Sequence, residues 1–277
     1  MNHRDAFSHL SGESLYVDDI ALPAHCLHAA VVTSPVANGT LLEVDIESAL
    51  SMPGVKTILR ARDIPGLNQI GDILPDERLL TEHHLNFIGK AVALVLADTS
   101  TQAHAAAANV HLRYETHAAI FTARDAYHQH STFGDERQFR KGDCKTAFEQ
   151  AAWSVSGQVD TQAQEHLYFE TQTALAIPHD GTRLKIFCAS QNPSSIQKFA
   201  ARILGIPMNA IEVEVPRLGG AFGGKEEQAK TWALLAALGA FVTQQPVKLT
   251  LTRQEDMHWT GKRHPYQADF RLGLDDD

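Results

Sequence analysis

The glycine-rich segment at residues 219–226, GGAFGGKE, carries the clearest chemical signal in the sequence. Four glycines among residues 219–224 allow positive φ angles, and they leave the backbone without Cβ atoms to block a ligand. The segment follows an alternating apolar stretch and precedes a long apolar one, so we expect it to connect a strand to a helix. Its N–H groups are then placed to bind an anionic ligand at the helix N-terminus. This pattern predicts the chemistry of the ligand but does not identify it.

Two nucleotide-binding motifs resemble this segment without matching it. The dinucleotide fingerprint Gly-x-Gly-x-x-Gly requires another spacing and an acidic residue about 20 positions later. The phosphate loop matches from Gly219 to Lys225, but Glu226 stands where a Ser or Thr hydroxyl should bind Mg²⁺. A nucleotide hydrolase with a degenerate phosphate loop is therefore one alternative. A glycine turn that only packs a strand against a helix is another.

Composition narrows the classes of protein to consider. The chain has 277 residues, with 24 Lys and Arg against 33 Asp and Glu, for a net charge of −9. This length predicts about two domains, and the acidic balance argues against a broad cationic surface for nucleic acid. No apolar run reaches the ~18 residues of a membrane span, and the N-terminus lacks the apolar core of a signal peptide. Three widely spaced cysteines fit neither a disulfide framework nor a zinc site. We therefore expect a cytoplasmic protein without nucleic-acid or membrane partners.

The periodicity of apolar residues predicts an α+β fold. We expect strands at residues 27–33, 41–46, 55–59, 91–97, 110–114, 154–161, 171–177, 183–189, 211–215, 247–252 and 267–274. We expect helices at residues 47–52, 101–109, 144–151, 194–204 and 226–243. The predicted organisation is a first domain over 1–118, a connection over 119–150, and a second domain over 151–277. A hairpin partner normally follows a strand such as 267–274, and none follows here. We therefore expect the second domain to be incomplete and its last strand to lack a neighbour.

A second alternating segment, QEHLYFE at residues 164–170, suggests another strand near the glycine loop. Alternate residues of a strand share a face, which here carries Gln164, His166, Tyr168 and Glu170. We interpret these side chains as a structural network that holds the loop rather than as ligand contacts. We also expect Lys225 to pair with a carboxylate rather than with a phosphate.

Three further segments flank the glycine loop in a fixed order. They are QEHLYFE at 164–170, SQNP at 190–193, and RQEDM at 253–257 with GKRHP at 261–265. Together they resemble the xanthine oxidase and aldehyde oxidase family, and in particular the molybdenum-binding subunits of its xanthine dehydrogenases. The segment LSGESLYVDDI at 10–20 is similar to the beginning of that family's α/β hammerhead domain. The resemblance covers essentially the whole chain. It implies a hammerhead domain followed by the first part of a molybdopterin-binding domain.

The resemblance implies a cofactor-binding role for five residues. Gln191 aligns with a glutamine whose side-chain amide hydrogen-bonds the apical oxo ligand of molybdenum. Phe222 and Gly223 align with a loop whose backbone N–H approaches the same oxo group, and Gly220 and Ala221 belong to that loop. Gln191 and Phe222 are thus implied to lie in the environment of the metal, without direct side-chain ligation.

Glu226 aligns with a pocket carboxylate that hydrogen-bonds the purine and stabilises charge during the reaction. The corresponding residue tends to be aliphatic in the aldehyde-oxidising members, so Glu226 favours a purine substrate. The implied reaction is hydroxylation of hypoxanthine and xanthine to urate, with water as the oxygen source. Electrons leave through Fe–S clusters and FAD to NAD.

The chain lacks the cysteine-rich and flavin-binding segments that this electron path requires. The resemblance therefore implies a partner subunit with the Fe–S clusters and FAD, and hence a hetero-oligomer. The family's general-base glutamate aligns beyond residue 277, so we expect the chain alone to be inactive. Two alternatives within this interpretation are an aldehyde oxidase or other molybdenum hydroxylase subunit, and a non-catalytic assembly fragment.

Overall fold

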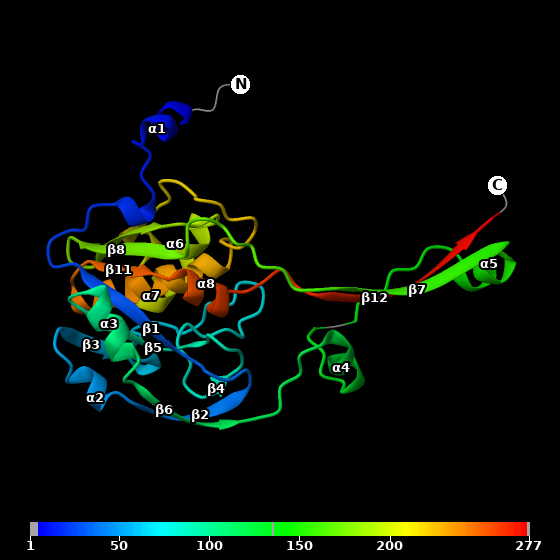
Figure 1. The fold of residues 1–277 in the computed structure, drawn as a ribbon, viewed down its shortest axis with the longest axis horizontal. Coiled ribbons are helices and arrows are strands. Elements are labelled where there is room, and N and C mark those ends of the chain that lie inside the picture. Colours follow the sequence, from blue (N-terminus) through cyan, green and yellow to red (C-terminus); the bar gives the residue numbers. More distant parts are fainter. Residues whose placement is uncertain (1–4, 135, 276–277) are drawn as a thin grey trace. The chain divides into compact units, whose positions relative to one another are not determined.

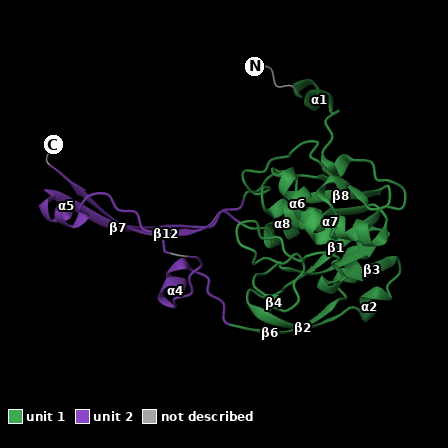
Figure 2. Cartoon of the chain, turned by 180° about the vertical axis from the view of Figure 1, so that it is seen from behind, with its two compact units in different colours: residues 1–117, 166–261 green, residues 118–165, 262–277 purple. Residues whose placement is uncertain are grey.

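The computed structural model describes residues 5–134 and 136–275, which form two compact units. Unit 1 comprises Met1–His117 and His166–Gly261, and unit 2 comprises Ala118–Glu165 and Lys262–Asp277 (Figure 2). Each unit therefore combines two stretches of chain that are far apart in the sequence. The sequence instead predicts two continuous domains, residues 1–118 and 151–277, joined by a connection. These bounds describe successive stretches of sequence rather than compact units, and they stay a prediction.

A seven-stranded mixed sheet forms the centre of unit 1 (Figure 1). Its strand order is β10-β9-β8-β11-β1-β5-β3. The strands are β1 (Leu27–Thr33), β3 (Val55–Leu59), β5 (Ala91–Ala97), β8 (Thr173–His179), β9 (Arg183–Cys188), β10 (Ile211–Glu214) and β11 (Val247–Thr250). The pairs β1–β11 and β9–β10 are parallel and the other pairs are antiparallel. The β1–β11 pair joins strands from the first part of the chain (β1, β5 and β3) to strands that follow residue 172 (β8 to β11) in one sheet.

Helices cover both faces of this sheet. They are α2 (Glu47–Leu50), α3 (Ser100–Ala107), α6 (Pro193–Leu204), α7 (Gln228–Thr243) and α8 (Arg253–Trp259). Alternation along β5 shows the two layers, because Leu94 and Leu96 join the core that contains α6 and α7. Ala93 and Val95 face the other way, into the core that contains residues of α2 and α3. All seven residues of β5 are buried, as expected of a strand covered on both faces.

Local signals explain where the helices begin and end. The Asn192 side chain accepts a hydrogen bond from the N–H of Ser195, Pro193 is the first residue of α6, and Gly205 ends the helix in the left-handed conformation. The sequence did not lead us to expect α8, although Thr252 and Glu255 form its capping box. No helix of the described residues is long and apolar enough to cross a membrane.

The remaining elements of unit 1 are smaller. A three-stranded sheet has the order β4 (His84–Leu85), β2 (Gly39–Asp45) and β6 (His111–Thr116). A short helix, α1 (Ala6–Ser11), precedes the first 3₁₀ turn. Helices and a mixed sheet in one unit confirm the predicted α+β class.

Unit 2 is built on a two-stranded antiparallel ribbon of β7 (Trp153–Thr161) and β12 (Tyr266–Leu274). It also contains the helices α4 (Ala123–His128) and α5 (Cys144–Gln150). The prediction that the last strand lacks a neighbour is wrong, because all nine residues of β12 pair with β7. The partner comes from an earlier segment of the chain rather than from a hairpin.

Candidate functional site

The glycine loop connects β10 to α7, as predicted, and contains no regular secondary structure. Gly220 and Gly223 have φ angles of 86° and 89°, and Phe222 between them has a φ of 54°. A non-glycine residue in this region costs about 1–3 kcal/mol, so the surrounding structure must impose the conformation. Burial of the Phe222 ring cannot supply that free energy, because the residue is 73% exposed.

Four successive N–H groups of the loop are free to bind an anion. The N–H of Gly219 donates to Glu170 Oε2 (2.9 Å), that of Gly224 to the carbonyl of Ala221 (2.7 Å), and that of Lys225 to Gln191 Oε1 (3.3 Å). Within the described part of the chain, the N–H groups of residues 220–223 donate no hydrogen bond. Successive free N–H groups in a turn bind anionic oxygens.

Lys225 fixes the end of the loop through a buried ion pair. Its side chain is completely buried, and Nζ lies 3.2 Å from Glu170 Oε2 and 4.6 Å from the centre of the Tyr168 ring. Burial lowers the pKa of the Lys225 ammonium, and the neighbouring Glu170 carboxylate opposes that shift. The predicted pairing with a carboxylate is confirmed. A lysine committed to Glu170 in the interior cannot bind a phosphate in the loop, and this contradicts the phosphate-loop alternative.

Tyr168 and Gln172 hold the other side of the loop through Asp256 of α8. The Tyr168 hydroxyl donates to Asp256 Oδ1 (2.7 Å), and the N–H of Gln172 donates to Asp256 Oδ2 (2.7 Å). Gln172 Nε2 donates to the Tyr168 hydroxyl (2.9 Å) and to the carbonyl of Gly224 (3.0 Å). Burial and the Asp256 carboxylate raise the pKa of the Tyr168 phenol, which therefore stays a donor at neutral pH.

The segment at residues 164–170 differs from the prediction in its backbone. It is not a strand, and Leu167 interrupts it with a φ of 46°. Gln164 belongs to unit 2, where it forms an isolated bridge with Arg263. Tyr168 and Glu170 belong to unit 1 and contact the loop, which confirms their interpretation as a structural network.

Gln191, which directly precedes the N-cap of α6, is hydrogen-bonded to both backbone polar groups of Lys225. Its N–H donates to the carbonyl of Lys225 (2.9 Å), and its side-chain Oε1 accepts from the N–H of Lys225 (3.3 Å). Ser190 Oγ adds a bond to that carbonyl (3.3 Å). With Oε1 turned toward the loop, the side-chain NH₂ of this exposed residue is available as a donor. Gln191 is thus joined to Lys225 at the end of the glycine loop. The cofactor-binding role that the resemblance implies for Gln191, Gly220, Ala221, Phe222 and Gly223 stays a prediction.

Glu226 lies between the buried Lys225 and the beginning of α7. Its side chain is exposed, and no hydrogen bond or ion pair joins it to the described residues. The next residue differs, because the Glu227 carboxylate pairs with Lys230. Glu226 is therefore a free carboxylate beside the loop, available to a ligand that donates hydrogen bonds.

The donor set of the loop fits the molybdenum cofactor implied by the resemblance. Among the described residues, no group of three or more His, Cys, Asp or Glu side chains could hold a metal ion. The loop offers backbone N–H groups and an amide instead, and these bind oxygen atoms rather than a bare cation. A metal that carries its own oxygen ligands matches this arrangement.

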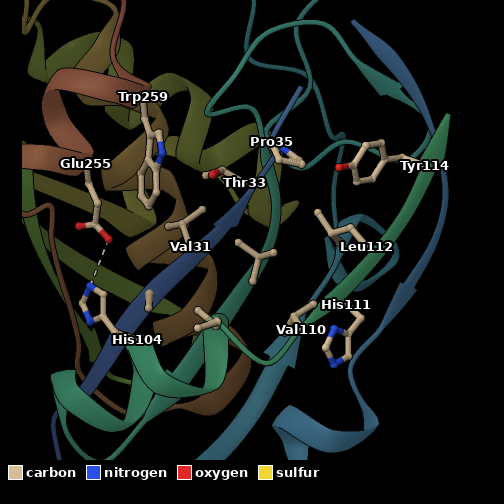
Figure 3. Close-up of a pocket in the computed structure, with 14 residues that line it drawn as sticks. Val31, Thr33, Pro35, His104, Val110, His111, Leu112, Tyr114, Glu255 and Trp259 are labelled. Atoms are coloured by element: carbon tan, nitrogen blue, oxygen red, sulfur yellow. Dashed lines mark ion pairs between the residues drawn. The ribbon is translucent and has the colours of Figure 1, made fainter. Parts of the chain in front are cut away.

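A separate hollow of about 450 Å³ lies beside α8 in unit 1 (Figure 3). On one side Glu255 of α8 extends toward His104 of α3, with Oε1 and Nε2 3.3 Å apart, and Trp259 lines the same side. The hydrogen bond that His104 donates to Glu255 raises the pKa of His104 more than burial lowers it. Burial alone would raise the pKa of Glu255, but hydrogen bonds from His104 and Thr252 hold it below its ordinary value. His104 and Glu255 are therefore committed to each other rather than to a ligand.

Sequence reasoning missed the part of the site that α8 supplies. No sequence pattern singles out Asp256 or Gln172, although Asp256 lies in the segment RQEDM that carries part of the family resemblance. The available signal was Thr252-x-x-Glu255, a capping box that marks the start of a helix. It locates the helix but not the partners of its buried carboxylate.

Comparisons with known proteins identify the family of the chain. Residues 11–118 match the family described as aldehyde oxidase and xanthine dehydrogenase, a/b hammerhead domain. Residues 123–277 match the molybdopterin cofactor-binding domain. The chain is 38% identical over 275 residues to a xanthine dehydrogenase/oxidase of Mus musculus, covering 99% of this chain and 20% of that protein. It is 35% identical over 274 residues to aldehyde oxidase 2 of Macaca fascicularis, covering 98% of this chain and 20% of that protein.

A solved structure shows the same fold. The aldehyde oxidoreductase from Desulfovibrio gigas superposes with a TM-score of 0.87 and 25% identity, covering 98% of this chain and 32% of that one. The chain spans about a fifth of the length of the curated relatives that it matches. With its hammerhead domain and part of a molybdopterin-binding domain, the chain belongs to the aldehyde oxidase and xanthine dehydrogenase family of molybdenum hydroxylases.

Proposed function

We propose that the chain forms one wall of the molybdenum site of a xanthine dehydrogenase, an enzyme of purine catabolism. The observation that carries the proposal is the pair formed by the clamped Gln191 amide and the free N–H groups of residues 220–223. When bound, the molybdenum cofactor supplies the oxygen transfer from water and the redox chemistry. The reaction proposed is hydroxylation of hypoxanthine and xanthine to urate.

The residues of the loop bind and orient the cofactor in this proposal. The Gln191 side-chain NH₂ and the N–H groups of Phe222 and Gly223 donate hydrogen bonds to its anionic oxygens. Gly220 and Ala221 continue the same row of donors. Donors fixed before the ligand arrives need little reorganisation during the reaction, which makes their electrostatic stabilisation effective.

Glu226 orients the substrate. A purine offers ring N–H groups, which a free carboxylate accepts, and charge that develops on the ring is stabilised through those bonds. An aliphatic side chain at this position would favour an apolar aldehyde instead. Glu226 is thus the residue on which the choice between purine and aldehyde depends within this chain.

The proposal also assigns the electron path to other parts of the enzyme. We infer that Fe–S clusters and FAD on a partner subunit pass electrons to NAD in a cytoplasmic hetero-oligomer.

The test uses the complete complex, purified with its partner subunits. We expect molybdenum by elemental analysis and urate formation from xanthine, with slower oxidation of benzaldehyde. Glu226→Gln should lower kcat/KM for xanthine by about 10²–10³-fold, and Glu226→Val should shift the preference toward the aldehyde. Glu227→Gln is the matched control, because that carboxylate pairs with Lys230. An active complex without molybdenum, or one that oxidises aldehydes but not purines, would contradict the proposal.

A further inference from the structure

Asp256 is a buried carboxylate that uses both of its oxygens within the protein. The residue is 1% exposed. Oδ1 accepts from the Tyr168 hydroxyl (2.7 Å), and Oδ2 accepts from the N–H of Gln172 (2.7 Å). A charged acceptor makes hydrogen bonds roughly twice as strong as a neutral one. Asp256 therefore fixes the positions of residues 168 and 172 relative to α8.

These two residues transmit the position of Asp256 to the glycine loop. Gln172 Nε2 donates to the carbonyl of Gly224 (3.0 Å), which orients the peptide group ahead of Lys225. The Tyr168 ring lies against the ammonium group of Lys225, 4.6 Å from ring centre to Nζ. A Cβ at Gly224 would lie 2.8 Å from Tyr168 Cε1, so the loop backbone packs directly on the ring. Two routes thus lead from one carboxylate to adjacent residues of the loop.

The helix that carries Asp256 is itself fixed along its length. At its start, Thr252 and Glu255 form the capping box, and Glu255 Oε1 lies 3.3 Å from His104 Nε2 (Figure 3). At its end, the Trp259 ring stacks on Trp232 of α7 with a centre-to-centre distance of 6.3 Å. Asp256 is therefore presented from a rigid support rather than from a loop.

We propose that Asp256 is a positioning residue for the glycine loop. Acting through Tyr168 and Gln172, it holds the peptide groups of Gly224 and Lys225. Gln191 is hydrogen-bonded to the backbone of Lys225. By fixing Lys225, Asp256 therefore also aligns the side-chain amide of Gln191 with the free N–H groups of residues 220–223. The effect on catalysis rests on the proposed function. The effect on the loop itself does not.

The experiment compares Asp256→Asn with Glu255→Gln in the complete complex. Both changes neutralise a carboxylate of α8, but only Asp256 contacts the network that holds the loop. Asparagine keeps the shape of aspartate and replaces one acceptor oxygen with an NH₂ group. In Asp256→Asn we expect amide hydrogen exchange at Gly224 and Lys225 to become about tenfold faster. We also expect an altered Mo(V) electron paramagnetic resonance signal and a lower kcat with little change in KM. Glu255→Gln should stay within about twofold of wild type in exchange and keep the wild-type Mo(V) signal.

Tyr168→Phe serves as a second variant, since it removes the bond to Asp256 Oδ1 and keeps the ring. It should speed amide exchange at Gly224 and Lys225 and alter the Mo(V) signal, as Asp256→Asn does. Should the complex with Asp256→Asn fail to assemble, Tyr168→Phe tests the proposal in its place. Wild-type exchange and signal in the variants of Asp256 and Tyr168 would overturn the proposal. Equal changes in Glu255→Gln would also overturn it, because α8 would then act only as a general support. Absence of molybdenum from the wild-type complex would refute the proposed function, while the exchange comparison would still test the positioning of the loop.

Discussion

The glycine loop of unit 1 and the β7–β12 ribbon of unit 2 are held in opposite ways. The loop has no regular structure, yet the buried side chains of Lys225, Glu170 and Asp256 fix it. The ribbon is regular along nine residue pairs, yet most of its side chains are exposed. Regularity and rigidity are therefore separate properties. A loop can be fixed by a few buried charges, while a strand pair can rest mainly on its backbone ladder.

One face of the ribbon shows how little side-chain burial contributes there. Directly opposite residues lie on the same face, and Trp153 faces Leu274 while Val155 faces Leu272. Trp153 is 70% exposed and Leu274 is 61% exposed. A two-stranded ribbon with this exposure is at best marginally stable on its own. Mutations in the two regions should therefore differ strongly in their effect on the free energy of unfolding.

Removing the buried charge under the loop should have the largest effect. Lys225→Met leaves the Glu170 carboxylate buried without its partner, which should lower the free energy of unfolding by about 3–5 kcal/mol. Urea unfolding followed by tryptophan fluorescence measures this, because Trp232 and Trp259 lie in unit 1. The control is Lys56→Met, which breaks an exposed ion pair with Asp98 and should cost at most about 1 kcal/mol. Equal costs would show that burial of the pair does not matter.

Glycine substitutions compare packing in the two regions. In Gly219→Ala the new Cβ would overlap the Cβ of Glu170, which the buried pair with Lys225 holds in place, so we expect a loss of about 1–3 kcal/mol. In Gly157→Ala of the ribbon, the new Cβ would lie 2.8 Å from the end of the Phe270 ring. That ring lies on an exposed face and can turn away, so the loss should be smaller. Thermal unfolding of both variants checks the order, and a larger loss at Gly157 would refute the comparison.

The His104–Glu255 pair beside α8 should make stability depend on pH. The pKa of His104 is raised above 6.5, so its contribution is complete below about 6.5 and is lost as pH rises through the raised value. The pKa of Glu255 is lowered from 4.5, so its contribution is complete above about 4.5 and is lost as pH falls through the lowered value. The cost of His104→Gln should therefore be greatest between about pH 4.5 and 6.5, at up to about 1 kcal/mol for this partly exposed pair.

Urea unfolding of wild type and His104→Gln across that range and up to pH 9 tests this window. The free energies of unfolding of wild type and His104→Gln should converge at high pH, because a neutral imidazole is not stabilised by the charge of Glu255. A difference in the free energy of unfolding that grows as pH rises would contradict the raised pKa of His104. Lys56→Met serves again as the control, since its exposed pair with Asp98 contains no histidine.

Local patterns predicted the elements of the fold better than they predicted the connections. The strands at Leu27–Thr33, Val55–Leu59 and Ala91–Ala97 lie where the apolar runs placed them. The position of the glycine loop and the pairing of Lys225 were also predictable, because a buried lysine needs a carboxylate. The tie between Asp256 and Tyr168 spans 88 residues, and it leaves no periodic signal in the sequence. The β7–β12 pairing likewise joins segments more than 100 residues apart, so the last strand had no visible partner.

The smallest effect should come from the apolar face of the ribbon. Val155→Thr keeps a β-branched side chain suited to a strand, and at this exposed position it should change the free energy of unfolding by less than about 0.5 kcal/mol. Val247→Thr in β11 makes the same chemical change at a fully buried position, where an unpaired hydroxyl costs about 1–3 kcal/mol. Urea unfolding of the two variants, followed by circular dichroism that reports on both units, compares their losses in free energy of unfolding. Should Val155→Thr cost as much as Val247→Thr, the face of the ribbon would have to be packed within unit 2, and the contrast with the glycine loop would fail.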